Sequence, residues 1–306
     1  IGFFMRCFFF IFFVLFFNLN ITEARTPGKN DNELQKLISK NKDFKDYPKE
    51  YLKNYHEHSS LWSKILPKIF HGEEMVLEIK YLWVKAGRLV IKTMSDRIVN
   101  SRKVHHIVGE VSSAPFYRKV YKIDDRIETF LDVKRFVPVR YFLIQRESKQ
   151  KVDDHQFFDL DRLKTSFTYR KEKRGKITKK RGEVFIPSHF QDFFSAFQFI
   201  RALPFVKKKT HIFPLVSRGK VSNIRVESLK KESIILLGKT YKALKFKAMM
   251  RPWNSTEEKK ERAFSIWLSD DKVRKILKFD AKVKLGRVQG HLVSYQEGVA
   301  RKGPGL

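Results

Sequence analysis

The feature that most constrains this chain is an alternation of apolar and polar residues that begins near Phe70 and continues to Tyr295. A period of two is that of a β-strand with one buried face. In the first run, every second residue from Met75 to Trp83 is apolar, and Ala86-Gly87 interrupts the pattern before it resumes. Two alternating runs separated by such a break predict a β-hairpin.

Similar runs predict strands at residues 103–110, 116–123, 126–133, 139–146, 163–171, 177–186, 220–228, 233–237, 241–250, 263–269, 275–285 and 288–295. Turn residues separate most of them, including Asp124-Asp125, Arg174-Gly175 and Leu237-Gly238. Because no helices alternate with these strands, we expect a mainly β fold built on an antiparallel sheet. A sheet of about a dozen strands curls, so we expect it to close into a barrel or to form a half-barrel.

One main helix is expected to interrupt the strands. Ser188 and Gln191 have the spacing of a capping box, and Pro204 ends a helix predicted over residues 188–203. Its apolar residues cover most of its circumference, so the helix should lie across the sheet or plug the end of the barrel.

The expected domain is residues 70–296. Residues 25–69 form a helical or partly ordered lead-in, with helices predicted at 33–38 and 59–66. Either this lead-in is a solvated spacer or it packs on the main domain. Residues 297–306 are expected to be a flexible tail.

The N-terminus has the pattern of a secretory signal peptide, expected to be residues 1–24. An apolar run of about 11 residues from Cys7 is short of the roughly 20 needed to span a bilayer. Ala24 is a plausible cleavage position. Cleavage would place the protein in the periplasm, whereas an uncleaved segment would anchor it to the inner membrane.

Composition excludes several classes of protein. Hydrophobic residues make up 42% of the chain, which is enough for a core. Cys7 is the single cysteine, so a disulfide scaffold, thiolate zinc sites and cysteine nucleophiles are excluded. The sequence has no glycine-rich phosphate loop, no G-x-S-x-G and no H-E-x-x-H. We therefore expect no cofactor and no catalytic constellation.

Three segments together resemble a family of exported Gram-negative bacterial proteins catalogued as domain of unknown function 3108. The first runs from Gly72-Glu73-Glu74 to Gly87, the second from Gln191 to Pro204, and the third from Ile266 through Asp271 to Gly286-Arg287. The resemblance implies an exported, antiparallel barrel-like domain and no defined activity. The residues that match the family pattern most clearly are Gly87, Gln191, Asp192, Ser195, Arg201, Trp267, Ser269, Asp271 and Gly286.

Positive charge is the strongest physical feature, because 64 Lys and Arg against 33 Asp and Glu give a net charge of +31. A protruding basic hairpin is predicted around Gly175, and its cations are the candidate anion-binding residues Arg170, Lys171, Lys173, Arg174, Lys176, Lys179, Lys180 and Arg181. For an exported protein, anionic lipid, lipopolysaccharide or acidic polysaccharide are the expected partners rather than nucleic acid, with peripheral membrane contact. The alternative is a set of solvated lysines without a ligand.

Other candidate groups have simpler interpretations. The pairs Asp124-Asp125, Asp153-Asp154 and Asp270-Asp271 are interpreted as turn residues rather than acid–base pairs. His56, His58, His105 and His106 lack further ligands at metal-site spacing, and His105 and His106 should face opposite ways. Arg201 on an apolar helix is expected either to pair with an acidic strand residue or to hold an anionic ligand. No metal site is predicted.

The sequence therefore favours a non-enzymatic periplasmic protein that serves the cell envelope, either by binding an amphiphile or anionic polymer or as an assembly factor. The alternative is a hydrolase of an envelope polymer. A buried carboxylate pair that lines a cleft and has no structural partner would favour the hydrolase.

Processing gives a first prediction. Signal peptidase should cleave after Ala24, because the small residue follows the short apolar run. N-terminal sequencing of the exported protein should then begin at Arg25. Recovery of the phenylalanine-rich N-terminus in the membrane fraction would instead indicate an anchor.

Overall fold

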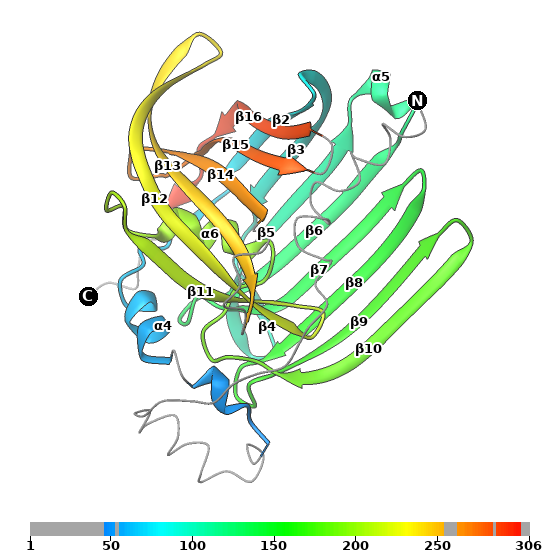
Figure 1. Ribbon diagram of the computed structural model, residues 1–306, viewed down its shortest axis with the longest axis vertical. Helices are drawn as coiled ribbons and strands as arrows, with labels where there is room; N and C mark the ends of the chain where they lie inside the picture. Colours follow the sequence, from blue (N-terminus) through cyan, green and yellow to red (C-terminus); the bar gives the residue numbers. More distant parts are fainter. Residues whose placement is uncertain (1–45, 53–54, 254–261, 284–285, 301–306) are drawn as a thin grey trace.

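The computed structural model describes residues 46–52, 55–253, 262–283 and 286–300. The predicted signal peptide and the predicted helix at 33–38 lie outside these residues. The described chain is mainly β, as expected, with one large antiparallel sheet of 15 strands (Figure 1). These are β2 (Glu74–Tyr81), β3 (Val84–Thr93), β4 (Arg97–Val99), β5 (Arg102–Ser113), β6 (Ile123–Asp132), β7 (Pro138–Glu147), β8 (Gln150–Asp159), β9 (Lys164–Lys173), β10 (Lys176–Phe185), β11 (Thr210–Ser217), β12 (Lys220–Leu236), β13 (Lys239–Pro252), β14 (Arg262–Ser269), β15 (Ile276–Val283) and β16 (Gly286–Gln296).

The sheet forms a half-barrel rather than a closed barrel. Its strands run in the order β10-β9-β8-β7-β6-β5-β3-β2-β16-β15-β14-β13-β12-β11, with β4 added beside β5. Within the described residues, β10 and β11 are the two edges, and they do not pair with each other. Figure 1 shows the strands β6 to β10 as one wall and β11 to β13 as the facing wall.

Side chains connect the two walls, although the edge strands β10 and β11 are not hydrogen-bonded to each other. Arg218, in the β11–β12 turn, forms an ion pair with the buried Asp154 of β8. The guanidinium also lies 3.9 Å from the centre of the Tyr169 ring on β9. Its backbone N–H donates to Gln156, at 2.7 Å. The turn thus rests on the inner face of β8 and β9.

Strand alternation produces the core as predicted. In β2, every second residue is buried, from Met75 to Tyr81. Neighbouring strands add their inner residues, so one apolar cluster extends from β2 around the sheet to β16. The 220–228 and 233–237 runs are joined into the single long strand β12, with a register shift between Ser228 and Lys230.

The helix inside the half-barrel is shorter than predicted. Helix α6 spans Ser195–Ala202 and lies within the curve of the sheet (Figure 1). The predicted capping box of Ser188 and Gln191 is wrong, since the Gln191 amide donates to the Phe136 carbonyl at 2.8 Å instead. Asp192 and Ser195 instead make the two reciprocal side chain–backbone hydrogen bonds that a capping box would make. The Asp192 carboxylate accepts from the Ser195 N–H at 2.7 Å, and the Ser195 hydroxyl accepts from the Asp192 N–H at 2.9 Å.

Several local predictions are corrected. The predicted strand at 116–123 contains the short helix α5 (Pro115–Arg118), because Pro115 fits the first turn of a helix. Asp124-Asp125 and Asp153-Asp154 lie inside β6 and β8 rather than in turns. Asp153 pairs with Arg146 of the adjacent β7 and Asp154 with Arg218 of the β11–β12 turn, whereas Asp125 accepts from the Gln145 amide of β7. Asp270-Asp271 does form a turn. Strands β8 and β11 were not predicted.

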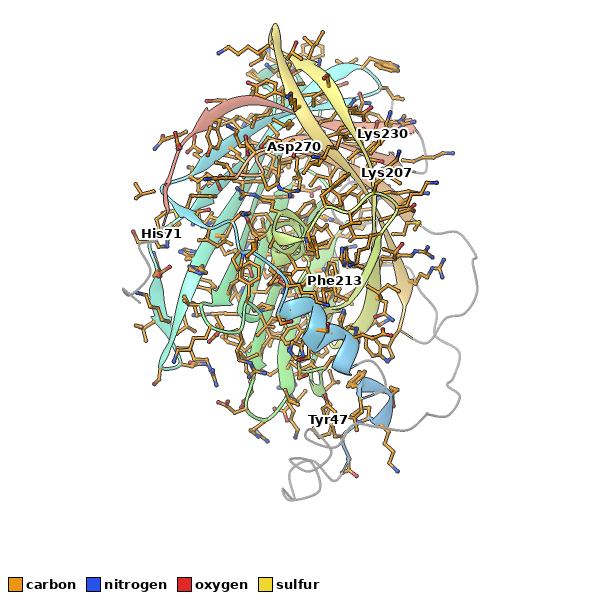
Figure 2. The ribbon with its side chains drawn as sticks, turned by 90° about the vertical axis from the view of Figure 1, so that its left-hand side faces the viewer. Tyr47, His71, Lys207, Phe213, Lys230 and Asp270 are labelled. Atoms are coloured by element: carbon orange, nitrogen blue, oxygen red, sulfur yellow. The ribbon has the colours of Figure 1, made fainter. Side chains whose placement is uncertain are left out.

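The lead-in packs on the main domain over its described part. It contains a 3-10 helix, η2 (Lys49–Tyr51), and α4 (Tyr55–Trp62). The Trp62 ring lies 4.3 Å from that of Phe199 on α6, and the Tyr47 hydroxyl donates to the Ile186 carbonyl at 2.9 Å. Figure 2 shows α4 beside Phe213, with Tyr47 at the lower end of the molecule.

The two ends of the domain also meet. Strand β1 (Phe70–His71) pairs with β17 (Val299–Ala300), which lies within the segment expected to be a flexible tail. Among the described residues, no helix is long and apolar enough to cross a membrane.

Candidate functional site

The three segments that carry the family pattern converge on Arg201. Its guanidinium makes a bidentate ion pair with Glu73, at 2.7 and 2.8 Å, and both side chains are completely buried. The remaining N–H groups donate to the carbonyls of Val273 and Arg274 and to the side chain of Gln198. All five donors of Arg201 are thereby used. Of the two roles expected for Arg201, the structure shows the pairing with an acidic residue.

The Ser269–Asp271 turn holds those carbonyls in place. The Asp271 carboxylate accepts from the backbone N–H groups of Val273 and Arg274, at 2.9 and 2.8 Å. It also accepts from the Ser269 hydroxyl, at 2.8 Å. Because the turn directs two carbonyl oxygens towards Arg201, this motif supports the same ion pair.

The other residues of the family pattern also have structural roles. Trp267 donates to Glu232 at 2.6 Å and lies between the ammonium groups of Lys245 and Lys278. A side chain at Gly87 would overlap with the Ser112 backbone of the paired strand β5. Gly286 has φ +102°, which side chains rarely adopt. These contacts support the fold.

The eight candidate anion-binding residues lie on β9, on β10 and in the turn between them. In β10, the residues from Lys176 to Glu183 are all exposed. Strand alternation and register place Arg170 beside Lys179 on one face, and Lys171 beside Thr178 on the other face, which also carries Tyr169 and Lys180. The cations therefore do not form one patch.

A groove of 440 Å³ runs along β8, β9 and β10, and we call it the basic groove. Its acidic member, Asp153, is compensated by Arg146 at 2.6 Å. Within the described residues, Lys179, Lys180 and Arg181 have no carboxylate within ion-pair distance. The groove is lined by Asp153, His155, Thr168, Tyr169, Arg170, Lys179, Lys180 and Arg181.

A partly buried carboxylate pair was not predicted. Asp125 of β6 and Glu147 of β7 share the amide of Gln145, at 3.0 and 3.2 Å, and the Tyr121 hydroxyl donates to Glu147 at 2.9 Å. Burial and the neighbouring carboxyl of Asp125 raise the pKa of Glu147 far above its usual range. Burial likewise raises the pKa of Asp125. Since protein groups hold both carboxyls, the pair has the structural partners that a free acid–base pair would lack.

His105 and His106 face opposite ways, as expected for adjacent strand residues. His106 lies 2.5 Å from the Glu128 carboxylate and stacks on Phe130, with ring centres 4.3 Å apart. His105 instead contacts Asp96, at 2.8 Å. His58 is buried beside Trp253, and burial lowers its pKa to about 4.

Fold and site define an open, basic half-barrel whose family-pattern residues hold the structure together. The chain belongs to the family described as protein of unknown function, DUF3108, whose model matches residues 76–293. None of the curated proteins searched matches the chain.

Several solved structures are similar in fold. A beta-barrel-like protein of domain of unknown function DUF1849 from Brucella abortus has 10% identity and a TM-score of 0.46, covering 76% of this chain and 99% of its own. A putative exported protein with a YmcC-like fold from Bacteroides fragilis has 9% identity and a TM-score of 0.34, with 76% and 100% covered. The hypothetical lipoprotein YmcC from Escherichia coli has 6% identity and a TM-score of 0.27, with 80% and 96% covered.

The Arg201–Glu73 pair yields a stability prediction. Glu73→Gln keeps the size of the side chain but leaves a buried guanidinium without a counter-ion, so unfolding should require about 3–5 kcal/mol less free energy. Chemical denaturation measures this. Glu74→Gln is the matched control, because Glu74 is partly exposed and its ion pair with Lys92 is long, at 3.8 Å. This substitution should lower the free energy of unfolding by less than about 1 kcal/mol. Equal stability of the two variants would contradict the role of Glu73.

The carboxylate pair predicts a pH dependence. Because the pKa of Glu147 is raised in the folded state, the folded protein keeps a proton that the unfolded chain releases above its ordinary value of 4.5. The stabilisation that Glu147 contributes is fully present below the ordinary pKa of 4.5 and decreases as pH rises above it. Glu147→Gln should therefore gain stability relative to the parent as pH rises from about 5 to about 8. Denaturation curves at several pH values measure the difference, and Glu183→Gln, at an exposed position, should leave the slope unchanged.

Proposed function

We propose that the protein is an exported, non-enzymatic protein of the bacterial cell envelope that binds phosphate-bearing anionic lipid at the basic groove. The observation that carries the proposal is a set of cations of β10 at the groove that lack carboxylate partners among the described residues. Lys179 and Arg181 lie on one face of the strand and Lys180 on the other, and all three are exposed. The one acidic side chain that lines the groove is already paired with Arg146.

The charge distribution explains why a phosphate group would bind here. Arg170 and Lys179 are cross-strand neighbours, and Arg181 is the next residue of β10 on the same face. Cations at such spacing can share one phosphate group, and a guanidinium can bind two of its oxygens. Arg170 is paired with Glu172, at 3.1 Å, whereas Lys179 and Arg181 have no carboxylate partner among the described residues. Like charges so close repel one another unless an anion is present. Binding an anionic headgroup would relieve this repulsion.

The β12–β13 hairpin favours lipid over a soluble polymer. In Figure 1 it extends as a long yellow ribbon beyond the body of the molecule. Near its tip, Ile235 and Leu237 are 74% and 72% exposed, and Lys230, Lys231 and Lys239 flank them. An apolar tip with a basic stem suits the boundary between acyl chains and anionic headgroups.

A location in the periplasm follows from the proposed signal peptide. The alternative of a hydrolase is weakened by the partners of the carboxylate pair, since Tyr121 and Gln145 hold Glu147. An assembly factor would use the same basic surface to stay near the membrane.

The test measures binding of the processed protein to vesicles of phosphatidylglycerol and phosphatidylcholine, and to vesicles that contain lipopolysaccharide. The test variant replaces Arg170, Lys179, Lys180 and Arg181 with Gln. Each cation near an anionic membrane contributes about 1 kcal/mol, so affinity at modest salt should fall by at least two orders of magnitude. Raised salt should weaken the parent in the same way.

The matched control removes the same charge elsewhere, with Lys207, Lys208, Lys209 and Lys272→Gln, all exposed positions. It should lose much less affinity. Ile235→Ser with Leu237→Ser should weaken vesicle binding but not binding of soluble polyphosphate. Equal binding by the groove and control variants would refute the proposal. Preference for a soluble polyuronate over vesicles would indicate an acidic polysaccharide instead. If the groove variant only aggregates more readily, its cations protect the exposed edge strand β10.

A further inference from the structure

We propose that His71, Asp96 and His105 form a zinc site beside the short strand β4, near the end of β3 and the start of β5. The three residues come from different elements. His71 ends β1, Asp96 lies between β3 and β4, and His105 lies in β5. Their donor atoms all lie within 4.8 Å of one another. Figure 2 shows His71 at the left-hand side of the molecule, so the site is separate from the core occupied by α6.

The donor geometry is close to that of a bound metal. One oxygen of Asp96 lies 2.8 Å from His71 Nε2 and 2.8 Å from His105 Nδ1. In a tetrahedral zinc site with metal–ligand distances near 2.0–2.1 Å, neighbouring donors are about 3.3 Å apart. The two Asp96–histidine distances would each lengthen by about half an ångström, and the two imidazole nitrogens, within 4.8 Å of each other, would move to a similar separation.

The donor types also fit zinc. Two imidazole nitrogens and one carboxylate oxygen form a three-residue ligand set that zinc uses when the fourth position holds water. His105 and Asp96 are largely buried, with side chains 7% and 11% exposed, whereas His71 is 27% exposed. The buried ligands fix the site and the more exposed one leaves a path for the ion.

The backbone around the site is fixed before any metal binds. The Gly72 N–H donates to the Thr93 carbonyl at 2.8 Å, and the Met94 N–H donates to the His106 carbonyl at 2.8 Å. These bonds hold the chain on both sides of the strands that carry the ligands. A preformed arrangement reduces the ordering cost of binding.

One neighbouring charge opposes the ion and provides a second test. Lys103 Nζ lies 3.5 Å from the other oxygen of Asp96, and its side chain is 52% exposed. An ammonium group at this distance competes with a cation for the same carboxylate. Removing the Lys103 charge should therefore strengthen zinc binding, whereas removing a ligand should weaken it strongly.

The experiment uses the processed protein without a histidine tag, stripped with chelator and titrated with Zn²⁺ against a chromophoric competitor. We expect one zinc per chain with micromolar or tighter affinity, and a higher melting temperature with zinc than without it. His71→Asn and His105→Asn should each weaken binding at least 100-fold. Lys103→Gln should strengthen it several-fold.

His106→Asn is the matched control, because His106 is adjacent to His105 but contacts Glu128 on the opposite face. It should leave zinc affinity unchanged. Circular dichroism establishes that each variant is folded, and if His105→Asn is not, His71→Asn and Lys103→Gln still decide the question. Zinc binding that is equally strong in the parent and in His71→Asn, or unaltered in Lys103→Gln, would overturn the proposal and leave Asp96 as a hydrogen-bond acceptor only.

Discussion

The buried ion pair of Arg201 and Glu73 is the constraint on which the rest of the structure depends. A guanidinium and a carboxylate without solvent are tolerated only when every donor and acceptor is used. The chain meets this condition by bringing α6, the start of β2 and the 269–275 turn to one point. The same requirement explains why the family-pattern segments lie far apart in sequence but meet in space.

Because the sheet is open, it has two edge strands, β10 and β11. A long exposed edge strand invites pairing with another chain, and natural proteins often place lysines there. β10 follows this pattern, with four basic residues among its exposed positions. The same charges line a groove, so protection of the edge and binding of an anion are compatible roles for one set of residues. On the other edge, β11 is joined to the far wall through Arg218 and Asp154.

Polar groups inside the half-barrel are held by specific partners rather than by water alone. Asp192 accepts hydrogen bonds from the first turn of α6 and from Thr129, and burial raises its pKa to about 6. Glu147 and Asp125 share Gln145 in the same way. Such groups fix one arrangement of strands and helix, because a shift in register would leave each of them unpaired. The interior therefore combines an apolar cluster with a few polar groups that specify its geometry.

The sequence by itself determined the strand class, most strand positions, the buried face of strands such as β2 and the presence of one internal helix. These features follow from the period of the apolar residues, which is a local property of the chain. Predictions from local sequence patterns were wrong where the same short segment is compatible with two kinds of local structure. Pro115 begins a helix where alternation predicted a strand, and Asp192 rather than Ser188 accepts from the backbone N–H groups at the start of α6. Asp124-Asp125 resembled a turn but lies in β6, where the Gln145 amide and the Arg146 N–H of the adjacent β7 donate to Asp125, and this pairing overrides the preference of aspartate for turns.

Only the tertiary structure decided which residues meet. Arg201 and Glu73 are 128 residues apart, Arg218 and Asp154 are 64 apart, and His71 and Asp96 are 25 apart. Strand order and the openness of the sheet set these contacts, and neither is encoded in the period of a single strand. The basic hairpin was visible in sequence because its charges are neighbours along the chain. The Glu147–Asp125 pair and the histidine cluster were not, because their members become neighbours only when separate strands pair or pack together.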